Sequence, residues 1–239
     1  MIRLAILSVL LLGICHAQEP VFIDDAKIEQ DFIDKLTSWE GKVETLTMRE
    51  AEAAIKKCRH RRVAIPDVPP KSSPLTPAAL YRQCAPSVVS IGSIFQCDKC
   101  SEWHGGGMAT GWIADPEGLV VTNAHIFQGG ENDPIGVMTM DGEIFPVKTI
   151  AAADKEKDIA ILQIDPGDKK LPFLPVANSA EIGEEVHVIS HPQGQYYCLT
   201  GGKISRFHRE HFKEDKNPTD WMGITADFAG GSSGGPVLN

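Results

Sequence analysis

The spacing of apolar residues changes once along the chain, near residue 66. Before that point apolar side chains recur at every third or fourth position, the period of an amphipathic helix: Ile28, Phe32, Leu36 and Trp39. Thr47 and Glu50 match a capping box, which marks the start of a second helix. We therefore expect a helical N-terminal extension over residues 18–65.

Prolines crowd the segment that follows. Five of the twelve residues in 66–77 are proline, which fixes φ and donates no backbone hydrogen bond. Such a run prevents regular structure and is typical of a semi-rigid linker. We expect the linker to end in a short helix that starts at Thr76 and Pro77.

The period becomes shorter in residues 78–239. The apolar segments there are brief, rich in Val and Ile, and separated by Gly, Pro, Asp and Asn, which is typical of strands. They cover residues 87–95, 108–114, 119–123, 135–140, 158–164, 185–190 and 221–227. Short strands at regular intervals predict a mainly β barrel or sandwich.

Composition and charge exclude some classes of function. The 239 residues are 42% hydrophobic and carry a formal net charge of −9, which is typical of a globular chain and not of a protein that binds nucleic acid. The basic run 56–62 follows a predicted helix, where cations complement the helix dipole. We therefore expect it to be a solvated helix end and not a binding patch.

The first residues resemble an export signal. Arg3 precedes an apolar stretch over residues 4–14, and small side chains at Cys15 and Ala17 suit cleavage after Ala17. The stretch is too short for a stable membrane span, which needs about 20 residues. We expect a signal peptide over residues 1–17 and an exported, periplasmic or secreted protein. A lipid anchor on Cys15 is the alternative, disfavoured by the bulky Ile14.

An odd number of cysteines follows the signal. Cys97 and Cys100 stand close together with His104 nearby, between two predicted strands. A structural zinc site needs four ligands, so we expect a local disulfide or another crosslink at the hairpin tip, with a metal site or a redox role as alternatives. The sequence leaves the pairing of all five open: Cys58, Cys84, Cys97, Cys100 and Cys198.

Three residues have the types and contexts that nucleophilic catalysis needs. A serine hydroxyl needs a histidine base, a carboxylate that orients the histidine, and amide donors for the oxyanion. His125 follows an apolar strand in "VVTNAHIF", and Asp158 begins another in "DIAIL", where we expect burial to keep its carboxylate oriented. Ser233 lies in "GGSSGGP", where glycines allow a sharp turn.

These blocks, together with "TGWI", resemble those of trypsin-like serine proteases, and most closely the bacterial HtrA (Deg) type. The resemblance covers about residues 79–239. It implies a double β-barrel of Greek-key strands, with the second barrel incomplete because the family's last two strands would follow Asn239. It also implies His125 as general base, Asp158 as orienting residue and Ser233 as nucleophile, with the amides of Gly231 and Ser233 as the oxyanion hole.

Two departures from the family bear on activation and specificity. Ser232 stands where trypsin has the aspartate that binds a newly formed N-terminus, so we expect no zymogen switch of that kind. Asp227 lies six residues before Ser233, the separation at which trypsin carries the aspartate that recognises Lys or Arg. A role for Asp227 as a loop cap is the alternative. We expect His191 to start a structural turn, and His208 and His211 to lie in a polar loop.

The functional expectation is an exported serine endopeptidase that acts on protein or peptide substrates, in protein quality control, and needs no metal or cofactor. The alternative is a noncatalytic or chaperone-like binding module on a protease scaffold. The sequence also suggests a longer protein, in which further strands and a peptide-binding PDZ domain would follow; a degenerate product with little activity is the alternative.

Overall fold

The structure is a computed structural model that describes residues 22–58, 61–66, 74–97, 99–100, 102–177, 179–211 and 218–239. The expected signal peptide and most of the proline-rich linker lie outside these residues. Within them, no helix combines the length and the apolar character that a membrane crossing requires.

Three helices precede the strands, and each begins at a residue that caps it. In α1 (Asp25–Ser38) the side chain of Asp24 accepts a hydrogen bond from the amide of Lys27. In α2 (Met48–Lys57) Thr47 and Glu50 form the predicted capping box in full. In α3 (Pro77–Cys84) Thr76 is the N-cap and proline occupies the first helical position, where no amide donor is needed.

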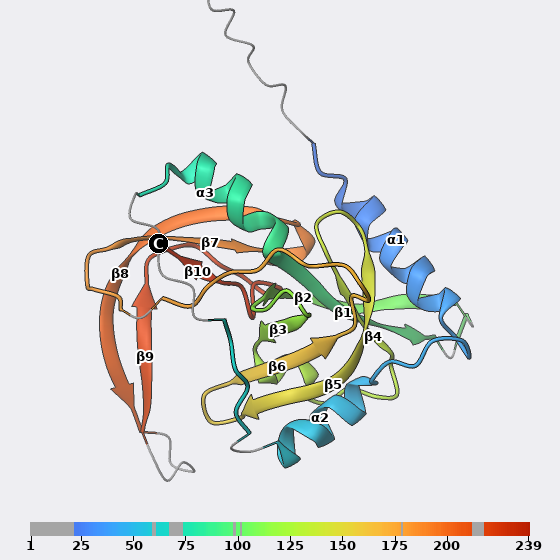
Figure 1. Ribbon diagram of the computed structural model, residues 1–239. Helices are drawn as coiled ribbons and strands as arrows, with labels where there is room; N and C mark the ends of the chain where they lie inside the picture. The colour runs from blue at the N-terminus through green and yellow to red at the C-terminus, as the bar shows by residue number, and fades with distance from the viewer. Residues whose placement is uncertain are drawn as a thin grey trace, which may run out of the picture.

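Six strands close into a barrel. They are β1 (Val88–Gln96), β2 (Trp103–Ile113), β3 (Leu119–Thr122), β4 (Ile135–Met138), β5 (Ile144–Asp154) and β6 (Ile159–Ile164), in the spatial order β1-β2-β3-β6-β5-β4 (Figure 1). All six pairings are antiparallel. The barrel interior is filled by buried aliphatic side chains, among them Val89, Ile113, Val137 and Leu162.

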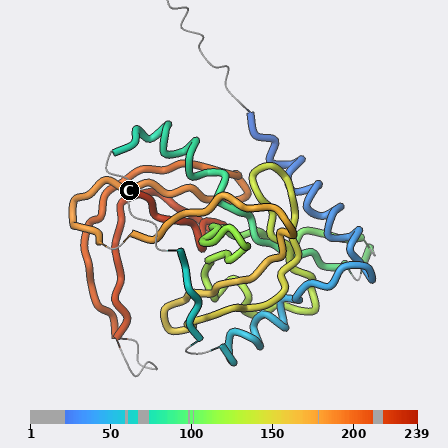
Figure 2. The backbone as a smooth tube through the Cα atoms, in the orientation of Figure 1, coloured from blue at the N-terminus to red at the C-terminus, as the bar shows by residue number. Residues whose placement is uncertain are grey.

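A second, open sheet lies beside the barrel. It contains β7 (Glu185–Ser190), β8 (Cys198–Glu210), β9 (Thr219–Ile224) and β10 (Val237–Leu238), in the order β10-β7-β8-β9. In Figure 2 strands β8 and β9 lie on the left of the barrel and helix α1 lies on its right. The mainly β fold, with one closed barrel and an incomplete second one, confirms the predicted fold class.

The two N-terminal helices pack on the barrel. Phe32 and Leu36 of α1 are 1% exposed and join a core cluster with Ile94. Ala51 and Ile55 of α2 join the barrel core itself. The helical extension is therefore part of the packed structure, with its apolar stripes buried as their spacing predicts.

The strand predictions omitted β5, β8 and the two-residue strand β10. We expected no strand over β5, which contains Pro146 and three alanines at 151–153, residues that are depleted in strands. We expected His208 to lie in a polar loop, but it lies in β8. Most residues of β8 are exposed or half-buried, so the strand lacks the apolar alternation that reveals a half-buried strand.

Candidate functional site

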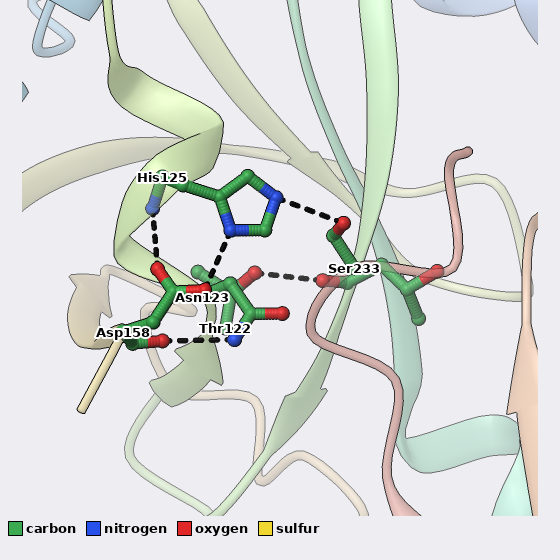
Figure 3. A network of polar contacts seen from close by, with 6 residues as sticks. Thr122, Asn123, His125, Asp158 and Ser233 are labelled. Atoms are coloured by element: carbon green, nitrogen blue, oxygen red, sulfur yellow. Dashed lines mark hydrogen bonds and ion pairs between the residues drawn. The ribbon is translucent and has the colours of Figure 1, made fainter. Parts of the chain in front are cut away.

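His125, Asp158 and Ser233 meet because neighbouring strands end at the same edge of the barrel. Strands β3 and β6 are antiparallel partners in which Thr122 lies opposite Ala160. The residues just after β3 and just before β6 therefore lie side by side. His125 stands in the short 3-10 helix that follows β3, and Ser233 comes from the turn before β10 (Figure 3).

The three side chains form a continuous series of polar contacts (Figure 3). His125 Nδ1 lies 2.6 Å from Asp158 Oδ2, and the backbone amide of His125 donates to Asp158 Oδ1 at 2.8 Å. On the other side of the ring, His125 Nε2 lies 3.0 Å from Ser233 Oγ. With the carboxylate fixing Nδ1 as the protonated nitrogen, Nε2 is left as an acceptor for the serine hydroxyl.

Hydrogen bonds, and not burial, orient the Asp158 carboxylate. Its side chain is 29% exposed, so the expectation of a carboxylate buried against the core was wrong. Asp158 has φ +54°, in the left-handed region, and its carbonyl accepts hydrogen bonds from Asn123 Nδ2 at 2.8 Å and the Ala124 amide at 3.2 Å. These contacts hold the backbone turn that directs the carboxylate at His125.

The turn that carries Ser233 requires glycine at two positions. Gly231 has φ +95° and Gly234 has φ +87°. A side chain on Gly231 would collide with the carbonyl oxygen of His191, and one on Gly234 would collide with that of Thr110. The glycines therefore serve a tightly packed, sharply turned backbone and not a flexible linker.

The two adjacent serines have different surroundings. Ser232 is buried, and its hydroxyl accepts hydrogen bonds from Ser190 Oγ at 3.0 Å and from the Ala229 amide at 3.3 Å. Ser233 is half-buried and lines the same cavity as His125. Ser232 therefore stabilises the turn from inside, while the Ser233 hydroxyl faces the histidine.

Thr110 in β2 ties this turn to the barrel, a role that the sequence analysis did not assign. Its side-chain hydroxyl donates to the Gly231 carbonyl at 2.7 Å and accepts from the His191 amide at 3.1 Å. Its backbone amide donates to the Ser233 carbonyl at 2.9 Å. The "TGWI" block that contains Thr110 was the only sequence signal for it, and the contacts span more than 80 positions along the chain.

A cavity of about 240 Å³ opens beside His125 and Ser233. Its walls come from β1, from β2 at Gly106–Met108, and from the N-terminal extension at Met48. Met48 is the first residue of α2. Its backbone amide donates a hydrogen bond to the Asp133 carbonyl at 2.9 Å, which holds the start of the helix beside the barrel. Sequence reasoning missed Met48 because nothing local connects it to the histidine 77 positions later.

The structure places Asp227 apart from that cavity. Its side chain is exposed, and its backbone carbonyl accepts a hydrogen bond from Thr200 Oγ1 at 2.8 Å. Asp227 is not among the residues that line the cavity with Ser233. Recognition of Lys or Arg by Asp227 stays a prediction.

His191, directly after β7, is fully buried and packs against the turn that carries Ser233. Burial lowers its pKa to about 4, because the charged imidazolium loses its hydration. Nδ1 accepts a hydrogen bond from the Tyr197 amide at 3.0 Å, and the ring packs edge-on against Tyr197. A neutral histidine therefore supports this turn, in agreement with the structural role expected for it.

Among the described residues, no cysteine lines the cavity beside His125 and Ser233. Cys58 is buried, with Sγ 3.4 Å from the Ile150 carbonyl. Cys100 is a free thiol, so the disulfide expected between Cys97 and Cys100 is not present. The sulfur atoms of these two residues and a ring nitrogen of His104 nevertheless lie within 4.8 Å of one another.

The chain is similar to a known protein family and to known proteins. Residues 109–239 match the family model of the trypsin-like peptidase domain. "Protease Do-like 1, chloroplastic" of Arabidopsis thaliana is 32% identical over 175 residues, 69% of this chain and 39% of that protein. "Serine protease HTRA3" of Homo sapiens is 33% identical over 138 residues, 54% of this chain and 30% of that protein.

The name of a bacterial relative also states a cellular location for that protein. "Probable periplasmic serine endoprotease DegP-like" of Chlamydia trachomatis is 35% identical over 134 residues, 54% of this chain and 25% of that protein. The matched segments thus span less than half the length of each of these three relatives.

Proposed function

Because the chain belongs to the family of trypsin-like peptidase domains, we propose that it is a serine endopeptidase that hydrolyses peptide bonds of protein substrates. The observation that carries the proposal is the series of contacts from Asp158 through His125 to Ser233, at 2.6 and 3.0 Å. Both distances lie within the reach that proton transfer requires.

In the acylation step the Ser233 oxygen attacks the carbonyl carbon of the scissile peptide bond, and its proton passes to His125 Nε2. The carbonyl oxygen becomes an oxyanion, which accepts hydrogen bonds from the backbone amides of Gly231 and Ser233. Asp158 stabilises the imidazolium. His125 then gives its proton to the leaving nitrogen as the C–N bond breaks, and the acyl group stays on Ser233 as an ester.

Water completes the cycle. His125 takes a proton from a water molecule, whose oxygen attacks the ester carbonyl, and the proton returns to the Ser233 oxygen as the C–O bond breaks. The amides of Ser232 and Gly235 donate within the turn, at 2.9 and 3.0 Å. This hydrogen bonding supports a rigid turn, in which the Gly231 and Ser233 amides can be preorganised for the oxyanion.

We further propose that the protein is exported and acts on misfolded chains. The apolar segment 4–14 and the word periplasmic in the name of a bacterial relative support export. A preference for Lys or Arg at the cleaved bond rests on Asp227 alone. Ser232 is hydrogen-bonded to Ser190 in the buried turn. This contact supports a site that assembles without a new N-terminus from zymogen cleavage.

The test is cleavage of an unfolded protein, such as reduced and alkylated casein, by the purified full chain. Wild type and Ser232→Ala are expected to produce peptides, whereas Ser233→Ala is expected to lose cleavage by at least about 10³-fold. A folded wild-type protein that binds casein without cutting it would favour the noncatalytic binding module instead.

A further inference from the structure

We infer that Cys97, Cys100 and His104 form a binding site for one Zn²⁺ ion at the tip of the β1–β2 hairpin. The inference does not depend on the proposed function, since none of the three residues belongs to the Ser233 site. Within the described residues this is the one group of His, Cys, Asp and Glu side chains close enough together to bind a metal ion.

The register of the hairpin puts two of the ligands on one face. Phe95 pairs directly with His104, and the Cys97 amide donates to the Glu102 carbonyl at 3.0 Å, which extends the ladder by one step. Residues directly opposite each other share a face of a β ladder, as do alternate residues of one strand. Cys97 and His104 therefore lie on the same face as diagonal neighbours.

The turn then brings the third ligand over that face. Cys100 lies in the turn beyond Cys97, and its Sγ is 3.1 Å from His104 Nε2. The His104 ring is held by Phe95, with ring centroids 5.6 Å apart. All three ligand atoms lie within 4.8 Å of one another. Two thiols and an imidazole nitrogen thus converge on one point at the exposed tip.

These separations fit zinc. Bond lengths of about 2.3 Å to sulfur and 2.0 Å to nitrogen at tetrahedral angles place sulfur atoms about 3.8 Å apart, and sulfur and nitrogen about 3.5 Å apart. The Cys100–His104 contact therefore needs to open by only a few tenths of an ångström. Soft thiolates together with imidazole select Zn²⁺ over Mg²⁺ or Ca²⁺.

Binding is balanced in charge and protons. The two thiols lose their protons to solvent, and the two thiolates neutralise the charge of the ion, so binding strengthens as pH rises. Three protein ligands leave the fourth tetrahedral position to water, because Cys97 and Cys100 are half-buried and exposed, respectively.

The position of the site gives the ion a structural consequence. It joins the end of β1 to the start of β2, and Gly106 and Gly107, which line the cavity beside Ser233, follow His104 by two and three residues. Gly105, which lies between His104 and Gly106, faces the Glu29 side chain of α1. A crosslink at the tip therefore restrains the strand pair that forms this cavity wall.

The experiment is metal titration of the reduced full chain carrying Ser233→Ala, which prevents self-cleavage. We expect about one Zn²⁺ per chain by elemental analysis, and with Co²⁺ as the probe the thiolate charge-transfer and tetrahedral d–d absorption bands. Cys97→Ser, Cys100→Ser and His104→Ala are each expected to weaken Zn²⁺ binding by more than about 100-fold, since loss of an outer-shell partner alone costs 10- to 100-fold.

Matched controls use the same substitutions elsewhere. Cys198→Ser and His211→Ala should keep full binding, and circular dichroism should show all variants folded, because the hairpin tip lies outside the core. The inference is overturned if the reduced protein binds no Zn²⁺, or if the hairpin variants bind as well as the controls. It is also overturned if mass spectrometry finds a Cys97–Cys100 disulfide and reduction restores no binding.

Discussion

Replacing Thr110 with valine tests how the barrel positions the turn that carries Ser233. Valine matches threonine in shape but lacks the hydroxyl that bonds the Gly231 carbonyl and the His191 amide. The buried His191 amide then lacks its partner at a cost of about 1–3 kcal/mol, and the half-buried Gly231 carbonyl adds about 1 kcal/mol. We expect the free energy of unfolding to fall by about 2 to 4 kcal/mol.

The effect on catalysis should be separable from that on stability. Thr110 holds the carbonyl of Gly231, and the backbone amide of the same residue is one of the two proposed oxyanion donors, so loss of this contact can displace that donor. Loss of one oxyanion donor lowers kcat by about 10²–10³-fold. A displaced donor should lower kcat by roughly 10- to 100-fold while KM changes little, because the donor acts on the transition state.

The assay compares kcat and KM on a fluorogenic peptide, at a temperature where urea titration shows the variant folded. Thr110→Ser keeps the hydroxyl and is the matched control, which should retain most of the wild-type kcat. If Thr110→Val loses stability but keeps kcat within about twofold of wild type, the hydroxyl serves stability only, and its proposed role in positioning Gly231 is wrong.

Three other substitutions test separate parts of the account. Burial lowers the pKa of His191 from 6.5 to about 4 in the folded state, so protonation favours the unfolded chain. Wild type should therefore lose up to about 3 kcal/mol of its free energy of unfolding as pH falls from 6.5 to 4. Urea titration should show that His191→Asn lacks this pH-dependent loss. Asp227→Asn should reduce cleavage after Lys and Arg in a peptide library, whereas apolar preference in wild type contradicts its assignment. Thr47→Ala breaks the capping box and should cost about 1 kcal/mol in thermal unfolding, with an unchanged midpoint arguing against any contribution from the cap.

Much of the fold could be predicted because local patterns and tertiary burial agree. Phe32 and Leu36 repeat at helical spacing and are buried together, and the Thr47 cap forms as written in the sequence. Strand β8 was missed because both its faces are largely polar, so no alternation distinguishes it from a loop. Its pairing with β7 and β9 is a property of the sheet and not of the segment.

The candidate site, like the fold, could be predicted only in part from the sequence. The contexts of His125, Asp158 and Ser233 were visible in the sequence, and the structure brings their side chains together. The supporting residues were not visible, because Thr110 and Met48 act through contacts with segments far away along the chain. The orientation of Asp158 was misjudged, since a backbone amide and not burial supplies it.

The most direct test of the central claim is to map a covalent adduct. The full chain is treated with a fluorophosphonate, digested with an unrelated protease, and analysed by tandem mass spectrometry. The account predicts a phosphonyl group on Ser233, abolished in Ser233→Ala, strongly reduced in His125→Ala and retained in Ser232→Ala. A folded protein that takes up no label, or that carries the label on Ser232, would contradict it.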